Sequence, residues 1–181
     1  MGNAKGTILV NAVKALRLKK DAAREVLPEH LHRYLEERIL AFAWYPEEDV
    51  LTILRALAKV TPDPGMDIYE FMGRIAARAD LEGVYSNLLR PGDPDGSLRR
   101  ASIIWRLYHD TGKQVVIESG DNSVVIEISG YQRPSRESCG TVKGWSVELV
   151  TLAGGKNVKV VHKECVLDGE KACRFKVAWT R

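Results

Sequence analysis

The chain of 181 residues has only three cysteines and no long apolar run. Three cysteines cannot all pair with one another, which argues against a fold held by internal disulfides alone. No stretch approaches the roughly 18 apolar residues that a membrane-spanning helix needs. The opening segment Met-Gly-Asn-Ala-Lys-Gly lacks the apolar run and the small-residue cleavage site of a secretory signal. We therefore expect a cytoplasmic protein without a membrane span.

An excess of charge of one sign is also missing. The chain has 27 basic and 24 acidic residues, with a net charge of +3. Its basic residues are dispersed, whereas nucleic-acid binders usually gather them on one stripe. We find no glycine-rich phosphate loop and no Ser-His-Asp constellation. We therefore expect no nucleic-acid partner and no enzymatic activity. The hydrophobic content of 45% is enough for a core, and we expect a single domain over residues 1–181.

Residues 1–110 show mainly helical periodicity. Apolar residues three and four apart predict helices near residues 8–16, 30–39 and 46–60. Asp67 followed by Glu70 is typical of a capping box at the start of another helix. Ser97 is the expected N-cap of a last helix, which would run to Tyr108.

The periodicity changes after residue 110. Alternating apolar residues predict a hairpin over 115–128, and residues 137–152 fit a helix that ends at Gly154. Two further alternating segments, 157–164 and 173–179, flank a turn at Asp168-Gly169. The order β-β-α-β-β predicts an α+β fold. Its mainly helical part, residues 1–110, would pack on a four-stranded antiparallel sheet in residues 111–181.

Three cysteines and one histidine of the C-terminal part could form a metal site. Helical spacing places Cys139 on the face that should pack on the sheet, and strand alternation turns His162 and Cys173 toward the same layer. Cys165 lies at a strand end, where the turn could bring it inward. Thiolate and imidazole suit a closed, structural zinc site. Spacing alone leaves two alternatives: three buried thiols acting as small apolar groups, or a Cys165–Cys173 disulfide.

A second candidate site is a small-molecule pocket formed by Trp105, Tyr108, His109 and Trp145. Aromatic side chains with polar handles are the usual lining of such pockets. The alternatives are structural: a histidine in the last turn of a helix is favourable to the helix dipole, and a tryptophan on an apolar face belongs to the core.

Three segments, residues 138–145, 158–165 and 169–175, resemble the 4-vinyl-reductase-type domain, over about residues 97–181. In that family a cysteine opens a helix, a second cysteine ends a strand, and a Gly-acid-x-x-Cys turn follows. The resemblance implies that Cys139, Cys165 and Cys173 match the family's zinc-binding cysteines. His162 stands where the family usually has Glu, which leaves Glu164 as a lesser candidate ligand.

Domains of the 4-vinyl-reductase type are sensory modules of bacterial regulators of aromatic catabolism. The resemblance therefore implies a sensory module that binds a small apolar or aromatic molecule. Their fold is similar to that of the TRAPP subunits of Golgi transport, which leaves a protein-interaction scaffold as an alternative. Because no output region is evident in the sequence, we expect a homodimer or a separate output protein.

The segment Lys5-Gly6-Thr7-Ile8 resembles the start of H-NOX haem domains, which are related in fold. Those domains bind haem through a histidine on a mid-chain helix, and His109 has a comparable place. They also hold the haem propionates with a Tyr-x-Ser-x-Arg motif. The nearest stretches here, residues 85–90 and 131–134, do not match it. A haem-based gas sensor of H-NOX type is thus an alternative, and we expect no haem.

Overall fold

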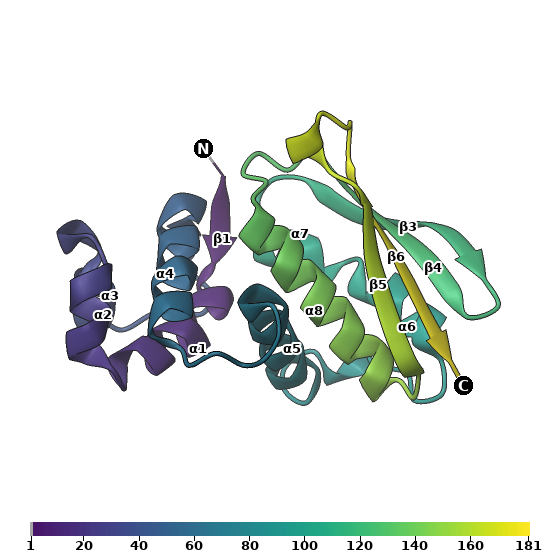
Figure 1. Ribbon diagram of the computed structural model, residues 1–181, viewed down its shortest axis with the longest axis horizontal. Helices are drawn as coiled ribbons and strands as arrows, with labels where there is room; N and C mark the ends of the chain where they lie inside the picture. Colours follow the sequence, from purple (N-terminus) through teal and green to yellow (C-terminus); the bar gives the residue numbers. More distant parts are fainter. Residues whose placement is uncertain (1) are drawn as a thin grey trace.

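The C-terminal half is a four-stranded antiparallel sheet covered by one long helix. The computed structural model describes residues 2–181. The strands are β3 (Lys113–Gly120), β4 (Ser123–Ser129), β5 (Lys156–Glu164) and β6 (Cys173–Thr180), in the spatial order β3-β4-β6-β5. Helix α8 (Arg136–Leu152) lies across one face of this sheet (Figure 1). The predicted α+β class and the β-β-α-β-β order are confirmed.

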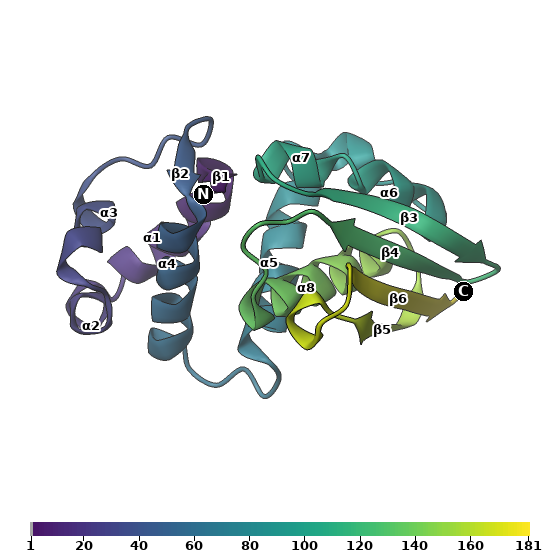
Figure 2. The same cartoon turned by 90° about the horizontal axis from the view of Figure 1, so that it is seen from above.

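Helix α5 (Ile68–Leu81) packs closely against α8 because glycines replace side chains where the two backbones meet. A Cβ atom on Gly144 would lie 1.9 Å from the carbonyl oxygen of Glu70, and one on Gly73 would lie 2.2 Å from that of Thr141. The capping box expected at the start of α5 is confirmed, since the Asp67 side chain accepts a hydrogen bond from the Glu70 amide at 2.8 Å. Figure 2 shows α5 and α8 on the same side of the sheet.

The expected helix over 97–108 is two helices, α6 (Pro94–Ala101) and α7 (Ile104–Tyr108). Ser97 as N-cap is wrong. Asp93 caps α6 instead by accepting from the Gly96 amide at 2.8 Å, and Pro94 takes the first helical position, where its missing N–H costs nothing. The buried Ser97 hydroxyl donates to the Asp93 carbonyl at 2.9 Å.

The N-terminal residues form short helices around a two-stranded sheet. Helices α1 (Gly6–Arg17) and α4 (Glu47–Val60) are near their expected places. The helix expected over 30–39 is shorter, a 3-10 turn at Glu29–Leu31 followed by α3 (Arg33–Glu36). The sequence did not indicate α2 (Lys20–Val26), β1 (Asn3–Lys5) or β2 (Trp44–Pro46). Further 3-10 turns are Ser86–Leu88 and Val166–Asp168.

The buried apolar side chains form two clusters. The N-terminal core consists of buried residues between Ala4 and Ala56, from β1 and α1 to α4. The C-terminal core runs from Ala77 to Trp179 and joins α5 to α8 with the sheet. The two bodies lie side by side in both views of the ribbon (Figures 1 and 2). Among residues 2–181, no helix is both long enough and apolar enough to cross a membrane.

Candidate functional site

The four predicted metal ligands converge where α8 meets the end of the β5–β6 hairpin. One ligand atom from each of Cys139, His162, Cys165 and Cys173 lies within 4.8 Å of every other. The sulfurs of Cys165 and Cys173 are 3.9 Å apart, and all three cysteines are free thiols, so the disulfide alternative is not what the structure contains. Four donors around one tetrahedral zinc ion lie about 3.5–3.8 Å apart. The cluster needs only a small contraction to reach that size.

The electrostatics of the cluster suit a metal cation. Burial, together with the neighbouring thiols, raises the pKa of Cys139, and burial also raises the pKa of Cys173. Burial and the nearby Arg136 charge lower the pKa of His162, which favours the neutral imidazole that coordinates metals. Within the described part of the chain, buried Nε2 of His162 has no hydrogen-bond partner. A bound cation would satisfy this nitrogen and stabilise the thiolates, so the residues fit zinc.

Glu164 belongs to a different set of contacts. Its carboxylate pairs with Arg174, whose Nη1 lies 3.0 Å from Oε2 and 3.2 Å from Oε1 of Glu164. The His162 ring instead stacks on Phe175, with ring centroids 4.1 Å apart. Regular alternation would turn both residues inward, and for Glu164 this expectation is wrong: the pairing of β5 with β6 shifts register between His162 and Glu164, which places Glu164 beside Arg174. Only His162 reaches the thiols. The geometry therefore favours His162 over Glu164 as the fourth ligand.

A cavity of about 620 Å³ lies between the two cores. Helices α1 and α4 contribute one wall, and α5, α7 and α8 contribute the other. The four pocket residues suggested by the sequence, Trp105, Tyr108, His109 and Trp145, all line this cavity. Its size falls within the range typical of small-molecule sites. The aromatic lining is Phe71, Trp105, Tyr108, Tyr131 and Trp145.

Glu47 and His109 form a pair at one end of the cavity. Nδ1 of His109 lies 2.6 Å from Oε1 of Glu47, and only 3% of the Glu47 side chain is exposed. Trp105 stacks on the His109 ring at 4.4 Å, and Tyr131 meets that ring edge-on at 5.1 Å. These contacts hold the imidazole between two aromatic groups and one carboxylate.

Asp80 is a second carboxylate on the cavity wall, contributed by α5. It accepts hydrogen bonds from the Tyr108 hydroxyl and, at 3.2 Å, from Nε1 of Trp145. Burial raises the pKa of Asp80, and the two donors offset part of that rise. Burial and the Asp80 charge likewise raise the pKa of Tyr108. The cavity therefore has acidic groups on both of its walls, among them Glu47 on α4 and Asp80 on α5.

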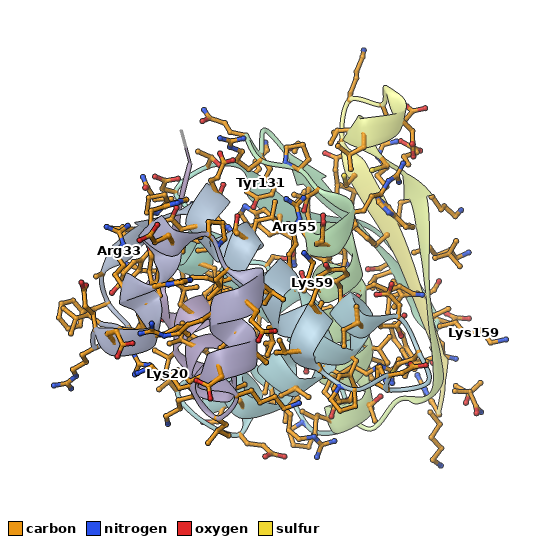
Figure 3. The ribbon with its side chains drawn as sticks, turned by 60° about the vertical axis from the view of Figure 1, so that its left-hand side comes forward. Lys20, Arg33, Arg55, Lys59, Tyr131 and Lys159 are labelled. Carbon is orange, nitrogen blue, oxygen red and sulfur yellow. The ribbon has the colours of Figure 1, made fainter. Side chains whose placement is uncertain are left out.

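The arginines of the cavity wall are already paired. Nε of Arg55 lies 2.7 Å from Oε1 of Glu137, and Arg133 pairs with Glu48. Figure 3 shows Tyr131 and Arg55 in the central region between the N-terminal helices and α8. Both ion pairs join the N-terminal body to the C-terminal body. They leave little positive charge free for an anionic ligand.

The sequence did not single out Glu47, Asp80 or Tyr131 as pocket residues. Glu47 and Asp80 stand among other charged residues of helices and look like solvated positions. Tyr131 follows the hairpin in a short irregular segment. Nothing in the local pattern marks these three side chains, because each is buried by contacts with elements distant in the sequence.

Solved structures with the same fold are H-NOX domains. An Fe(II) unliganded H-NOX protein from K. algicida has 15% identity and a TM-score of 0.72, covering 98% of this chain and 97% of its own. An H-NOX protein from S. oneidensis in the Fe(II)NO ligation state has 14% identity and a TM-score of 0.67, with 98% and 99% covered. No family model and no curated protein matches the chain. The chain therefore has the fold of H-NOX domains, while membership of the 4-vinyl-reductase-type family stays a prediction.

Proposed function

We propose that this protein is a non-enzymatic sensory module that binds a small apolar or aromatic molecule and holds a structural zinc ion. The cavity between the two cores, with its aromatic lining, is the observation that carries the proposal. Such a cavity favours a ligand-binding module over an interaction scaffold similar to TRAPP subunits, which needs no pocket.

Zinc would be held by Cys139, His162, Cys165 and Cys173. Four protein donors close the coordination shell and leave no position for a substrate, so the role is structural. The ion would link α8 to both strands of the β5–β6 hairpin. Support comes from the convergence of the donors and from the unpartnered Nε2 of His162.

The zinc proposal is tested by metal content in three matched variants. We expect one zinc per chain in the wild type, a strong loss in His162→Gln, and full content in Glu164→Gln and in His30→Gln, an exposed histidine elsewhere. Elemental analysis and native mass spectrometry measure this directly. Wild-type protein that is grown with zinc but isolated without it would refute the zinc assignment. Loss of zinc in Glu164→Gln alone would identify Glu164, and not His162, as the fourth ligand.

The ligand would occupy the cavity between the two bodies. A molecule that fills this space contacts α1 and α4 on one side and α5, α7 and α8 on the other. It therefore stabilises the arrangement in which these walls face each other. This differential contact is what a sensory module requires, since a ligand shifts an equilibrium only through unequal affinity for two states.

Ligand binding is tested with a neutral aromatic probe. We expect phenethyl alcohol to bind the wild type and to bind Ala15→Phe much more weakly, because Ala15 lines the cavity. The control is Ala22→Phe, at an exposed position of α2. Isothermal titration calorimetry gives both affinities. Equal binding by Ala15→Phe and Ala22→Phe would show that the probe binds elsewhere.

A haem-based sensor is the second candidate function, because the chain has the H-NOX fold and His109 lines the cavity. The other lining residues fit a haem poorly. Haem propionates need cationic partners, but both arginines of the lining are already engaged by acidic residues, and Glu47 and Asp80 add negative groups. We therefore propose a ligand other than haem. Reconstitution with haemin is the test, and a Soret band that disappears in His109→Ala would establish the haem sensor instead.

The organisation and assembly of the module are also proposals. We propose that residues 1–181 form one folding unit, and that the signal passes through a homodimer or to a separate output protein. Native mass spectrometry reports the number of chains in the same experiment that reports zinc.

A further inference from the structure

The buried carboxylate of Glu47 is incompletely satisfied. Oε1 is engaged by His109, but buried Oε2 has no hydrogen-bond partner among residues 2–181. A charged oxygen removed from water without a donor raises the free energy of the protein. Glu47 lines the cavity, so a ligand placed there could supply the missing donor.

Gly2 packs directly against this oxygen. A Cβ atom on Gly2 would lie 2.5 Å from Oε2 of Glu47, closer than real Cβ atoms approach another heavy atom. Glu47 is also the first residue of α4, at the positive end of the helix dipole. The site thus presents a buried carboxylate oxygen that packs against the Gly2 backbone on one side and lines the cavity through Glu47 on the other.

The remaining charges of the cavity do not neutralise Glu47. Arg55 and Arg133 are paired with Glu137 and Glu48, and Asp80 adds a further acidic group on the opposite wall. His109 contacts only Oε1, through Nδ1, so Oε2 is left without a partner among the described residues. The polar end of the cavity therefore favours a cation.

Aromatic side chains surround the same end. Trp105 and Tyr131 meet edge-on with ring centroids 5.0 Å apart, and both contact the His109 ring. Faces and hydroxyls of such rings attract a partly desolvated cation. Toward the other wall, Phe71 and Trp145 offer apolar surface.

We propose that the cavity selects a ligand with a protonated amine on an apolar or aromatic body, and that the amine binds the Glu47 carboxylate. This inference rests on the proposed ligand-binding function and adds the charge of the ligand. The ammonium would donate to Oε2, while its body would lie against the aromatic wall.

The test compares three probes that share a phenyl-alkyl body: phenethylammonium, phenethyl alcohol and hydrocinnamate. Isothermal titration calorimetry with the full chain should show phenethylammonium at least about tenfold tighter than the alcohol, because a charge-assisted hydrogen bond is stronger than a neutral one. Hydrocinnamate should bind weakest. Equal affinities of amine and alcohol, or a preference for the carboxylate, would overturn the inference.

Three variants test whether the preference for the amine over the alcohol depends on Glu47. Glu47→Gln should bind the amine and the alcohol equally, and Gly2→Ala, whose new methyl group would displace Oε2, should reduce the preference without removing a charge. Glu25→Gln, an exposed carboxylate in α2, carries the same charge change and should keep it. An unchanged preference in both site variants would contradict the inference, even if one of them folds poorly.

The two proposals fail in different ways. Binding of phenethyl alcohol without a preference for the amine keeps the ligand-binding function and refutes only the charge selectivity. If none of the three probes binds the wild type at millimolar concentration, the ligand-binding function fails, and the selectivity fails with it.

Discussion

The N-terminal and C-terminal bodies are stabilised in different ways. Helices α5, α6 and α8 each begin with a side-chain cap, from Asp67, Asp93 and Ser135 respectively. In the described residues, α1 to α4 begin without one. A side-chain cap is worth about 1 kcal/mol. The comparison indicates that the C-terminal body is locally the more stable of the two.

The two bodies also differ in how far apart in sequence their contacts lie. The thiol cluster joins Cys139 to Cys173, and the sheet pairs β4 with β6 across the whole of α8. The N-terminal core is built within residues 4–56 from short neighbouring helices. Since local openings begin where stabilising contacts are few, the N-terminal wall of the cavity should open first. A ligand that bridges both walls would then stabilise the weaker body more.

Removing the metal should cause the largest loss of stability, and this loss should be confined to the C-terminal body. We expect Cys173→Ser to destabilise the protein on the order of 5 kcal/mol, because zinc binding contributes directly to folding. Hydrogen exchange should accelerate in α8, β5 and β6 and change little in α1 to α4. Thermal unfolding and exchange mass spectrometry measure both effects.

The control for this substitution is Ala172→Ser, which places a hydroxyl at the neighbouring buried position without removing a thiol. It should lose much less stability and keep its metal. Melting of Cys173→Ser at the wild-type temperature, with unchanged exchange, would remove the proposed difference between the bodies.

Separating α5 from α8 should have the next largest effect. In Gly144→Ala the new methyl group would meet the Glu70 carbonyl oxygen at 1.9 Å, so the two helices must move apart. We expect a loss of about 2–3 kcal/mol, typical of overpacking. Gly120→Ala is the control, since the nearest atom to its Cβ would be the Ser123 hydroxyl oxygen, at 3.2 Å, which a side-chain rotation can move. Similar unfolding midpoints in denaturant for the two variants would contradict the importance of this contact.

The more stable body was also the more predictable from sequence. Alternation over 157–164 and 173–179 gives the faces of two strands directly, so the placement of His162 and Cys173 followed from their positions. The position of Cys139 followed in the same way from helical spacing. In a regular strand or helix with one buried face, the apolar residues recur at the period of the element, so the sequence itself shows which side chains face the core.

The N-terminal body and the cavity lacked such a pattern. Helix α2 buries only Ala23, and β1 and β2 have three residues each, too few for a period to show. Glu47 and Asp80 are acidic residues in helices, which a sequence alone assigns to solvent. Glu47 is buried against His109 of the other body, whereas Asp80 is covered by α7 and α8 of its own body. No local pattern records either contact.

Loss of a cap should have a smaller effect, again in the stronger body. Asp67→Ala removes the side chain that accepts from the Glu70 amide and should destabilise α5 by about 1 kcal/mol. Glu82→Ala, at the exposed C-terminal end of the same helix, is the matched control and should change stability by less. Denaturant titration of both variants decides the question. An Asp67→Ala protein as stable as Glu82→Ala would show that caps do not distinguish the two bodies.

The smallest effect is expected at Asp80, on the C-terminal wall of the cavity, and it depends on pH. Burial raises the pKa of Asp80 above its ordinary value of 3.8, so the folded protein binds this proton more tightly than the unfolded chain does. The resulting stabilisation is complete below pH 3.8 and is lost as the pH rises through the pKa of the folded state.

Asp80→Asn cannot titrate, and its amide oxygen can still accept from Tyr108 and Trp145. We therefore expect this variant to be more stable than the wild type at pH 7 and equally stable at pH 3, as measured by thermal unfolding across that range. A constant difference at all pH values would mean that the carboxylate of Asp80 is as well solvated in the cavity wall as in the unfolded chain.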